Sequence, residues 1–228
     1  MSELQLDIQN LEHSYSGSGD EILHIPRLSI KKGESVFLHG PSGCGKSTLL
    51  GLVAGTLSPK SGKICLQQAE MTCLSKRKRD KFRADQIGCI FQQFNLLPYL
   101  NALDNVMLGC QFSRLRRNRI SSVTAEAQRL LTALDLPNSL WHSKVSQLSL
   151  GQQQRVAAAR ALIGIPSLIL ADEPTSALDQ KNADTFLELL FRECKQHDIA
   201  LLMVSHDLRM KDKFDRSLAF AELTGGVL

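Results

Sequence analysis

The first part of the chain alternates apolar and polar residues with the period of two that is typical of β-strands. This alternation runs from Leu4 to Tyr15, and short apolar runs follow at Leu23–Ile30 and Val36–Leu38. The clusters Gly17–Gly19 and Lys31–Gly33 separate the runs and have the composition of turns. We therefore expect three strands joined by tight turns, paired antiparallel.

In the middle of the chain the apolar period changes from that of a strand to that of a helix. A short strand at Lys63–Leu66, a basic helix at Ser75–Ala84 and a strand at Ile87–Phe91 are predicted first. Between residues 92 and 147 the apolar residues then recur on one helical stripe, formed by Leu103, Val106, Met107, Val123, Ala127, Leu130, Leu131 and Leu134. This stripe predicts a mostly helical insertion.

The last third of the chain alternates helical and strand patterns. Helices are expected at Gly151–Ile163 and Gln180–Gln196, and strands at Leu168–Ala171 and Ile199–Val204. Alternating strands and helices build a parallel sheet that is flanked by helices. The chain is therefore predicted to be an α/β protein with an antiparallel N-terminal part.

Composition narrows the class of protein further. The chain has 228 residues, of which 43% are hydrophobic and 22% charged, as is ordinary for a globular protein. Its net charge of +4 is mild and does not by itself indicate a nucleic-acid-binding protein. Its 6 cysteines show no C-x-x-C spacing, so neither a zinc cluster nor a secreted disulfide framework is indicated. The pattern shows no signal peptide and no apolar stretch of about twenty residues. We expect a protein of the cytosol that does not cross a membrane unaided.

Two clusters of basic residues stand out against this mild net charge. One is Lys76–Arg79, and the other contains Arg114, Arg116, Arg117 and Arg119. Such clusters are most often solvated surfaces. The alternative is contact with anionic lipid headgroups, which attract basic residues.

The sequence GPSGCGKST has the spacing and context of a phosphate-binding P-loop. It follows the apolar run Ser35–Leu38, opens a second apolar run, and comprises Gly40, Pro41, Ser42, Gly43, Cys44, Gly45, Lys46, Ser47 and Thr48. Glycines let the backbone curl around an anion, and the following helix adds positive charge at its N-terminus. Lys46 would reach the β- and γ-phosphates, and Ser47 would bind Mg²⁺. A glycine turn without a ligand is the alternative, but it leaves Lys46 unexplained.

Two adjacent carboxylates end the predicted buried strand Leu168–Ala171. Side chains alternate along a strand, so Asp172 and Glu173 point in different directions. Asp172 could hold Mg²⁺ through water while Glu173 addresses an attacking water. A pair of solvated carboxylates capping a turn is the alternative reading.

The segment LSLGQQQR, residues 148–155, resembles the LSGGQ signature of the ABC (ATP-binding cassette) ATPases. The resemblance extends over essentially the whole chain, and it implies that Ser149, Gly151 and Gln152 contact ATP. Alone, the segment could simply be a serine N-cap that starts a helix. Leu150 stands where the family has glycine, and a left-handed backbone there would be costly. Members of this family close as dimers around ATP, and we therefore expect the dimer of this chain to close less tightly.

The same resemblance assigns roles to four further residues. Gln92 looks like the Q-loop glutamine, which senses Mg²⁺ and the attacking water, and Asp179 resembles the D-loop aspartate, which crosses to the opposite subunit. Asp179 is also expected to cap its helix. His206 matches the switch histidine at the γ-phosphate. Tyr15 lies where the family stacks an aromatic ring on adenine, although a half-buried strand tyrosine remains an alternative.

The family resemblance implies a P-loop NTPase (RecA-like) core with an antiparallel β subdomain and a helical insertion. Residues 1–91 with 155–228 would form the core, and residues 92–154 the helical and signature subdomain. Two copies would pair head to tail, close on ATP and reopen on hydrolysis. Independently of the resemblance, Cys44 lies next to Lys46 at the head of a helix, and both favour the thiolate, so thiol alkylation should block the ATPase and ATP should protect it. An inert buried cysteine is the alternative.

The resemblance also implies a separate membrane permease as partner, with this chain at the cytoplasmic face of the inner membrane. The run FQQFNLLPYLNALDNVML resembles the subgroup that works with lipoprotein-release, macrolide-efflux and division-type membrane subunits. The partner should dock a helix beside Gln92, against apolar residues such as Tyr99 and Leu100, unless these pack the core. One alternative is a soluble ABC ATPase that acts on nucleic acid in translation or repair; a nucleotide kinase would not need the signature. No nucleic acid is expected as a partner.

Overall fold

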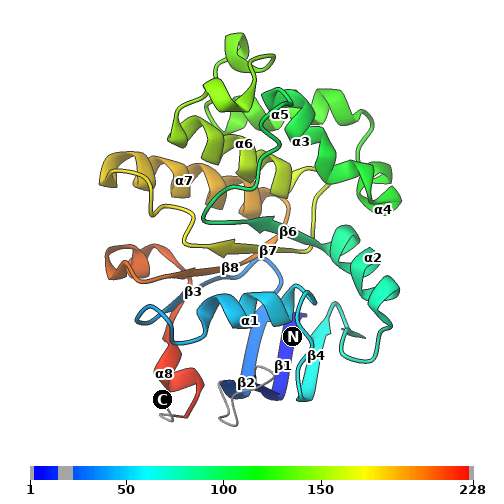
Figure 1. Cartoon of the computed structure of the whole chain (residues 1–228), viewed down its shortest axis with the longest axis vertical. Coiled ribbons are helices and arrows are strands. Elements are labelled where there is room, and N and C mark those ends of the chain that lie inside the picture. Colours follow the sequence, from blue (N-terminus) through cyan, green and yellow to red (C-terminus); the bar gives the residue numbers. More distant parts are fainter. Residues whose placement is uncertain (1–2, 15–22, 226–228) are drawn as a thin grey trace. The chain divides into compact units, whose positions relative to one another are not determined.

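The computed structural model describes residues 3–14 and 23–225 (Figure 1). Two compact units divide the chain. The first combines Met1–Arg83 with Ala200–Leu228, and the second is Ala84–Ile199. The predicted turn Gly17–Gly19 and Tyr15 lie outside the described residues.

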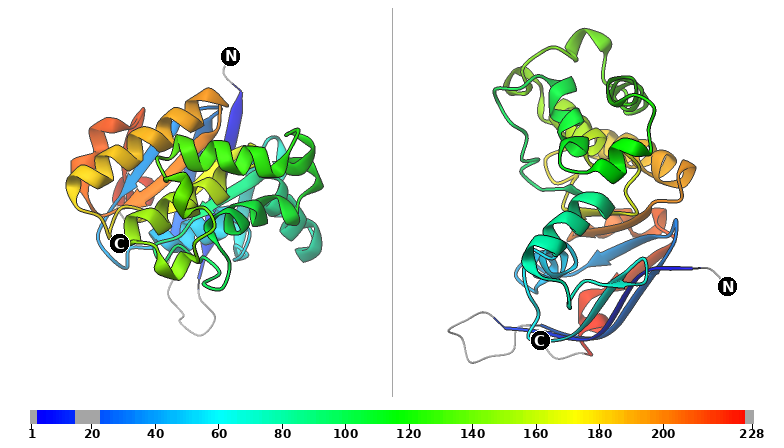
Figure 2. Two further views of the ribbon diagram at one scale, coloured as in Figure 1. Left: turned by 90° about the horizontal axis from the view of Figure 1, so that it is seen from above. Right: turned by 90° about the vertical axis from the view of Figure 1, so that its right-hand side faces the viewer.

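The first unit contains an antiparallel sheet with the strand order β2-β1-β4-β5. These strands are β1 (Leu4–His13), β2 (Leu23–Lys31), β4 (Ser61–Leu66) and β5 (Ala69–Glu70). In the register, Ile8 of β1 pairs with Leu28 on one side and Ile64 on the other. Figure 2 (right) shows β1, β2 and β4 side by side in blue and cyan. The predicted antiparallel pairing of the first two strands is confirmed; β5 was not predicted.

A second set of strands in this unit is parallel. It consists of β3 (Ser35–His39), β8 (Ala200–Ser205) and β9 (Arg216–Ala219), with β3 between the other two. The expectation that β3 pairs antiparallel with β2 is therefore wrong. Val36, Phe37 and Leu38 are all fully buried, and a run buried on both faces is typical of a parallel sheet. Gly33, with a φ of 71°, lies in the turn before β3.

The helices around these strands are α1 (Lys46–Val53), α2 (Lys76–Gln86), the 3₁₀ segment Leu208–Lys213 and α8 (Phe220–Leu223). Two of the helices in this unit, α1 and α2, were predicted, whereas the two after β8 were not. In α1, the buried Leu49, Leu52 and Val53 recur at helical spacing and hold the helix against the core.

The second unit combines two parallel strands with the predicted helical insertion. The strands are β6 (Ile87–Ile90) and β7 (Leu168–Asp172), in a register that pairs Ile90 with Ala171. The helices are α3 (Ala102–Gln111), α4 (Arg114–Asn118), α5 (Val123–Ala133), α6 (Leu150–Leu162) and α7 (Gln180–Gln196), and 3₁₀ turns lie at Asn138–Leu140 and Val145–Gln147. No helix of the described residues is both long and apolar enough to span a membrane.

The sequence suggested that residues 114–119 form one solvated or lipid-facing surface. The structure shows instead that part of this basic cluster is used inside the fold. Arg116 is only 4% exposed and donates hydrogen bonds to the carbonyl oxygens of Ile163 (2.9 Å) and Ala161 (2.5 Å). Burial lowers the pKa of its guanidinium to about 10. Arg119 likewise donates to the carbonyl of Ile165. These arginines cap the C-terminal end of α6, where the helix dipole favours positive charge.

Candidate functional site

The predicted phosphate loop joins β3 directly to α1. Gly43 and Gly45 have φ values of 83° and 105°, in the left-handed region where a side chain would be strained. A Cβ on Gly40 would lie 3.0 Å from both the Cys44 sulfur and the Cβ of Phe220. The tight curl between strand and helix therefore needs glycine at these three positions.

Lys46, the first residue of α1, folds back over this loop. It is 6% exposed, and its Nζ donates to the carbonyl oxygens of Gly40 and Pro41, each at 2.8 Å. The same ammonium lies 3.9 Å from the sulfur of Cys44. A cation is thus held at the centre of the loop by carbonyls rather than by a carboxylate, so its charge stays available to an anion.

The N-terminus of α1 has no side-chain cap. Its N-cap is Gly45, and no acidic residue lies in the first turn. The first backbone N–H groups of an α-helix point out of its N-terminus and carry the positive end of its dipole. Ser47 and Thr48 place hydroxyl groups in the same turn. With the glycine curl and Lys46, these groups form a cradle that fits the phosphates of a nucleotide.

His206 comes to this cradle through the register of the parallel strands. His39 at the end of β3 pairs with Ser205 at the end of β8. The next residues, Gly40 and His206, therefore leave the sheet at the same edge. His206 is exposed, and Asp207 after it is held by Arg209, whose Nη2 lies 2.6 Å from Oδ2. Hydrogen bonds from Arg209 lower the pKa of the Asp207 carboxyl.

A second group of predicted site residues meets at the edge of β6 and β7. Because Ile90 pairs with Ala171, the segment with Gln92 and the segment with Asp172 and Glu173 leave neighbouring strands at the same end. Gln92 is exposed, and both carboxylates are half-buried. Glu173 has a φ of 43°, an unusual conformation for a residue with a side chain, of the kind that clusters at functional sites.

The segment that resembles the signature forms the start of α6. Ser149 is its N-cap: its hydroxyl accepts from the N–H of Gln152 at 3.3 Å, and its own N–H donates to the Gln152 side chain at 2.9 Å. The serine cap and the signature are thus the same structure, so the two interpretations of this segment do not compete. Leu150 does not have a positive φ, and the backbone cost expected there is not present. Its side chain is 55% exposed.

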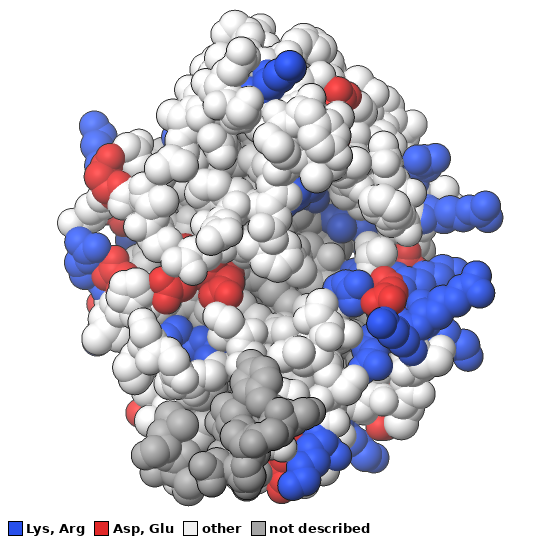
Figure 3. Space-filling model, viewed as in Figure 1, with Lys and Arg blue, Asp and Glu red and all other residues white. Residues whose placement is uncertain are grey.

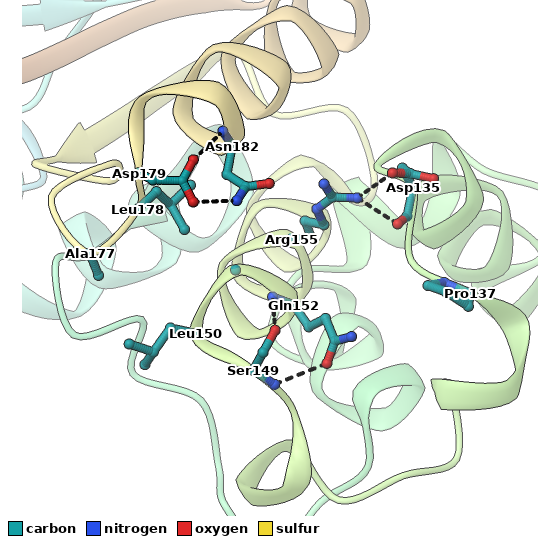
Figure 4. Close-up of a pocket in the computed structure, with 11 residues that line it drawn as sticks. Asp135, Pro137, Ser149, Leu150, Gln152, Arg155, Ala177, Leu178, Asp179 and Asn182 are labelled. Atoms are coloured by element: carbon teal, nitrogen blue, oxygen red, sulfur yellow. Dashed lines mark hydrogen bonds and ion pairs between the residues drawn. The ribbon is translucent and has the colours of Figure 1, made fainter.

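A pocket of about 580 Å³ opens beside this helix start, within the second unit (Figure 4). Besides residues 149–152 it is lined by Asp135, Pro137, Arg155, Ala177, Leu178, Asp179 and Asn182. Asp179 caps α7: it accepts from the backbone N–H of Asn182 at 3.0 Å and from its side chain at 2.6 Å. These bonds lower the pKa of the Asp179 carboxyl. The predicted signature and D-loop residues therefore line one pocket.

The pocket also contains residues to which the sequence interpretation gave no role. Arg155 bridges to Asp135, with Nη1 2.7 Å from Oδ2, and donates to the Asp135 carbonyl at 2.6 Å. Twenty residues separate these partners in sequence, so no local pattern joins them. The one hint is Asp135 itself, which has a φ of 59° directly after α5 and its C-cap.

The predicted site residues thus form three groups. Residues 40–48 lie with His206, Gln92 lies with Asp172 and Glu173, and Ser149, Gly151 and Gln152 lie with Asp179. Tyr15 falls outside the described residues. No cluster of three or more His, Cys, Asp or Glu side chains among the described residues could hold a metal by itself. Mg²⁺ fits here as an ion that takes few protein oxygens and fills its shell with phosphate and water.

Comparison with known proteins identifies this arrangement. Residues 23–176 match the family model described as "ABC transporter". The lipoprotein-releasing system ATP-binding protein LolD of Hydrogenovibrio crunogenus is 39% identical, over 97% of this chain and 96% of its own. The uncharacterized ABC transporter ATP-binding protein YbbA of Escherichia coli is 40% identical, over 93% and 92%.

Solved structures show the same fold. The ATP-binding cassette MJ0796, in a dimeric post-hydrolysis state bound to ADP and Pi, superposes with a TM-score of 0.83 at 33% identity, covering 97% of this chain and 95% of that one. CbiO1 from Clostridium perfringens, part of the transporter complex cbiONQ, gives 0.84 at 26% identity, over 99% and 88%.

The fold and the phosphate cradle are those of a P-loop ATPase. The chain belongs to the ABC transporter family. It is an ATP-binding and ATP-hydrolysing subunit of an ABC transporter, and the predicted resemblance to lipoprotein-release subunits is confirmed.

Proposed function

We propose that two copies of this chain bind two ATP molecules head to tail, each ATP lying between the P-loop of one copy and the signature of the other. Residues 40–48 bind the phosphates, and Ser149, Gly151 and Gln152 of the opposite copy complete the site. Tyr15 stacks on adenine. Asp179 contacts the opposite copy, so that the two sites sense each other.

Hydrolysis in this proposal is divided among the residues at the strand ends. Glu173 accepts a proton from the attacking water, Gln92 orients that water, and His206 contacts the γ-phosphate. Ser47, Asp172 and Gln92 would hold Mg²⁺, which neutralises developing charge on the phosphates. Residues 1–91 with 155–228 act as the catalytic core, and residues 92–154 as the moving helical part.

One observation carries the proposal: α6 presents a capped N-terminus with Ser149 exposed and Gly151 beside an open pocket. A Cβ on Gly151 would meet only Leu178, at 3.4 Å. The cap uses the N–H groups of Ser149 and Gln152. Between them Gly151 leaves room at the positive end of the helix dipole, which suits close approach by a phosphate. Supporting it, a dimeric relative of known structure holds ADP and Pi.

We further propose that the ATPase drives a membrane permease of the lipoprotein-release class, from the cytoplasmic face of the inner membrane. The similarity to LolD supports this class. The permease would dock a short helix beside Gln92, where Tyr99 is 68% exposed. The alternative, a cassette that acts on nucleic acid, has no support among the relatives named above.

Mixed dimers test the head-to-tail site directly. Lys46→Ala disables the P-loop of one copy and Ser149→Arg the signature of the other, and each variant alone should be inactive. Mixing them gives heterodimers with one doubly damaged and one intact site, so about a quarter of parental ATPase activity should return. Mixtures that stay inactive, although heterodimers form, would show that each site uses a single chain.

A further inference from the structure

The helix α2 carries basic residues on two opposite faces. The side chains of one face bind the rest of the fold, and those of the other are exposed. On one face, Arg79 donates to the hydroxyl of Ser58 at 2.9 Å, and Arg83 donates to the carbonyl of Ala54 at 3.4 Å. A Cβ on Gly55 would lie 2.7 Å from the Arg79 side chain, so this arginine packs closely on the chain. Arg79 and Arg83 are one turn apart and anchor α2 at the C-terminal end of α1, where positive charge is favoured.

The opposite face of α2 contains Arg77, Lys78 and Lys81. At about 100° per residue, these three side chains fall within an arc of about 100° centred opposite Arg79 and Arg83. All three are exposed, and none of their side chains has a hydrogen-bond or ion-pair partner within residues 3–14 and 23–225. We call these residues the outer basic face. Figure 3 shows Lys and Arg gathered on the right-hand side, over α2.

The fold gains nothing from these charges. Arg77 and Lys78 lie in the first turn of α2, which contains no acidic residue, so they face the positive end of the helix dipole. Lys81 follows them at the i+4 and i+3 positions, where like charges repel. The nearby carboxylate of Asp80 is already paired with Arg83 at 2.9 Å. Charges that oppose local stability are expected where an external partner uses them.

We propose that the outer basic face binds the phosphate headgroups of anionic lipids at the membrane surface. The proposal rests on the proposed function, because a permease would bring this chain to a membrane. Three clustered cations that stand clear of the fold suit a layer of headgroup phosphates, which carries many charges in one plane. The mild net charge of +4 does not by itself indicate a nucleic-acid-binding protein.

Vesicle binding by the full chain tests this directly. Co-sedimentation is measured with phosphatidylcholine vesicles that contain or lack phosphatidylglycerol, at low and high salt. The parent should bind only the anionic vesicles, and less at high salt. The triple variant Arg77→Gln, Lys78→Gln, Lys81→Gln should lose about a hundredfold in binding, since each basic residue near such a surface contributes about fivefold.

A control variant carries the same loss of charge elsewhere: Lys60→Gln, Lys144→Gln, Lys195→Gln, all at exposed positions. It should bind the anionic vesicles as the parent does. If the triple variant fails to fold, the single variants Arg77→Gln and Lys81→Gln should each lose about fivefold. Unchanged binding by the outer-face variants, or equal losses in the control, would overturn the proposal.

Two further arms separate other ligands and the proposed function. Full competition by soluble glycerol phosphate, or binding of a DNA duplex that the triple variant alone loses, would overturn the lipid assignment. ATPase activity is measured on the same preparations. If the parent hydrolyses ATP but does not bind anionic vesicles, only the lipid proposal is overturned. If it binds these vesicles but does not hydrolyse ATP, only the proposed function is overturned.

Discussion

Arg160 donates a hydrogen bond from Nη1 to the carbonyl oxygen of Asn95, at 2.6 Å. Its Nη2 donates to the carbonyl of Phe94 at the same distance. Phe94 and Asn95 both have left-handed backbones, with φ values of 56° and 49°. Because Arg160 lies on α6, one guanidinium fixes the segment after Gln92 to the helix that begins at the signature.

We predict that Arg160→Lys weakens this connection. Lysine is shorter than arginine and has one nitrogen in place of the two that bind here, so its ammonium cannot hold both carbonyls in the same parallel geometry. The free energy of unfolding should fall by about 1–3 kcal/mol. The kcat of ATP hydrolysis should fall with little change in KM, because the P-loop belongs to the other compact unit. Urea unfolding and steady-state kinetics measure both effects.

Arg192→Lys is a matched control for that variant. Arg192 is exposed and donates to a single carbonyl, that of Ala133, at 2.8 Å. The variant Arg192→Lys should leave the free energy of unfolding and the kcat of ATP hydrolysis nearly unchanged. Equal behaviour of the two variants would show that the paired bonds of Arg160 have no special role.

Glu173→Gln should bind ATP but hardly hydrolyse it. Glutamine has the shape of glutamate and can keep the backbone at a φ of 43°, but it cannot accept the proton of the attacking water. Turnover should fall by a factor of about 10² to 10⁴, and ATP should hold the protein as a dimer in size-exclusion chromatography. Glu188→Gln, at an exposed position of α7, is the control. Near-normal turnover of Glu173→Gln would remove Glu173 from the catalytic role.

The sequence predicted best those features whose determinants lie close together in the chain. The strand, glycine loop and helix around Lys46 and the serine cap at Ser149 are examples, since each is determined by residues that follow one another directly in the chain. The direction of β3 could not be read in this way, because it depends on pairing with β8, far along the chain. The short β9 and α8 have too few residues for a period to show.

Long-range contacts also decide what a charged residue does. Arg116 and Arg77 both lie in basic runs that look alike in the sequence. Arg116 is buried against carbonyls of α6, whereas Arg77 is exposed on the outer basic face. Only the packing of helices from distant parts of the chain distinguishes them. The ion pair of Arg155 with Asp135 could not be predicted from the sequence for the same reason.

Thiol alkylation should inactivate the ATPase through Cys44. Its sulfur lies inside the phosphate loop, 3.9 Å from Nζ of Lys46, and the residue as a whole is 8% exposed. Cys110 and Cys194 are more deeply buried, and burial raises their pKa values, that of Cys194 to about 12, so they should stay unreactive while the chain is folded. ATP should slow the loss of activity by covering the loop. Mass spectrometry of iodoacetamide-treated protein, sampled alongside activity, follows each site.

Cys73 provides the control for this experiment because it is exposed and far from the loop in sequence. Its thiol donates to the Glu70 carboxylate at 2.9 Å, which raises its pKa and slows its alkylation. Glu70→Gln should therefore speed labelling of Cys73 without changing the loss of ATPase activity. Cys44→Ser should make the enzyme resistant, and a Cys44→Ser enzyme as sensitive as the parent would assign the effect to another thiol.

Tyr99→Asp should separate the chain from its membrane partner without unfolding it. The tyrosine ring is 68% exposed in the segment after Gln92, so a charge there costs the isolated subunit little, whereas an apolar docking helix would have to bury that charge. Phe94, five residues earlier and only 5% exposed, supplies the contrast: Phe94→Asp should unfold the subunit. Tyr99→Asp should keep its unfolding transition and its ATP binding, and lose recovery with detergent-solubilised membranes. Recovery at the parental level would move the docking site away from Tyr99, and unfolding of Tyr99→Asp would make Tyr99 a part of the core.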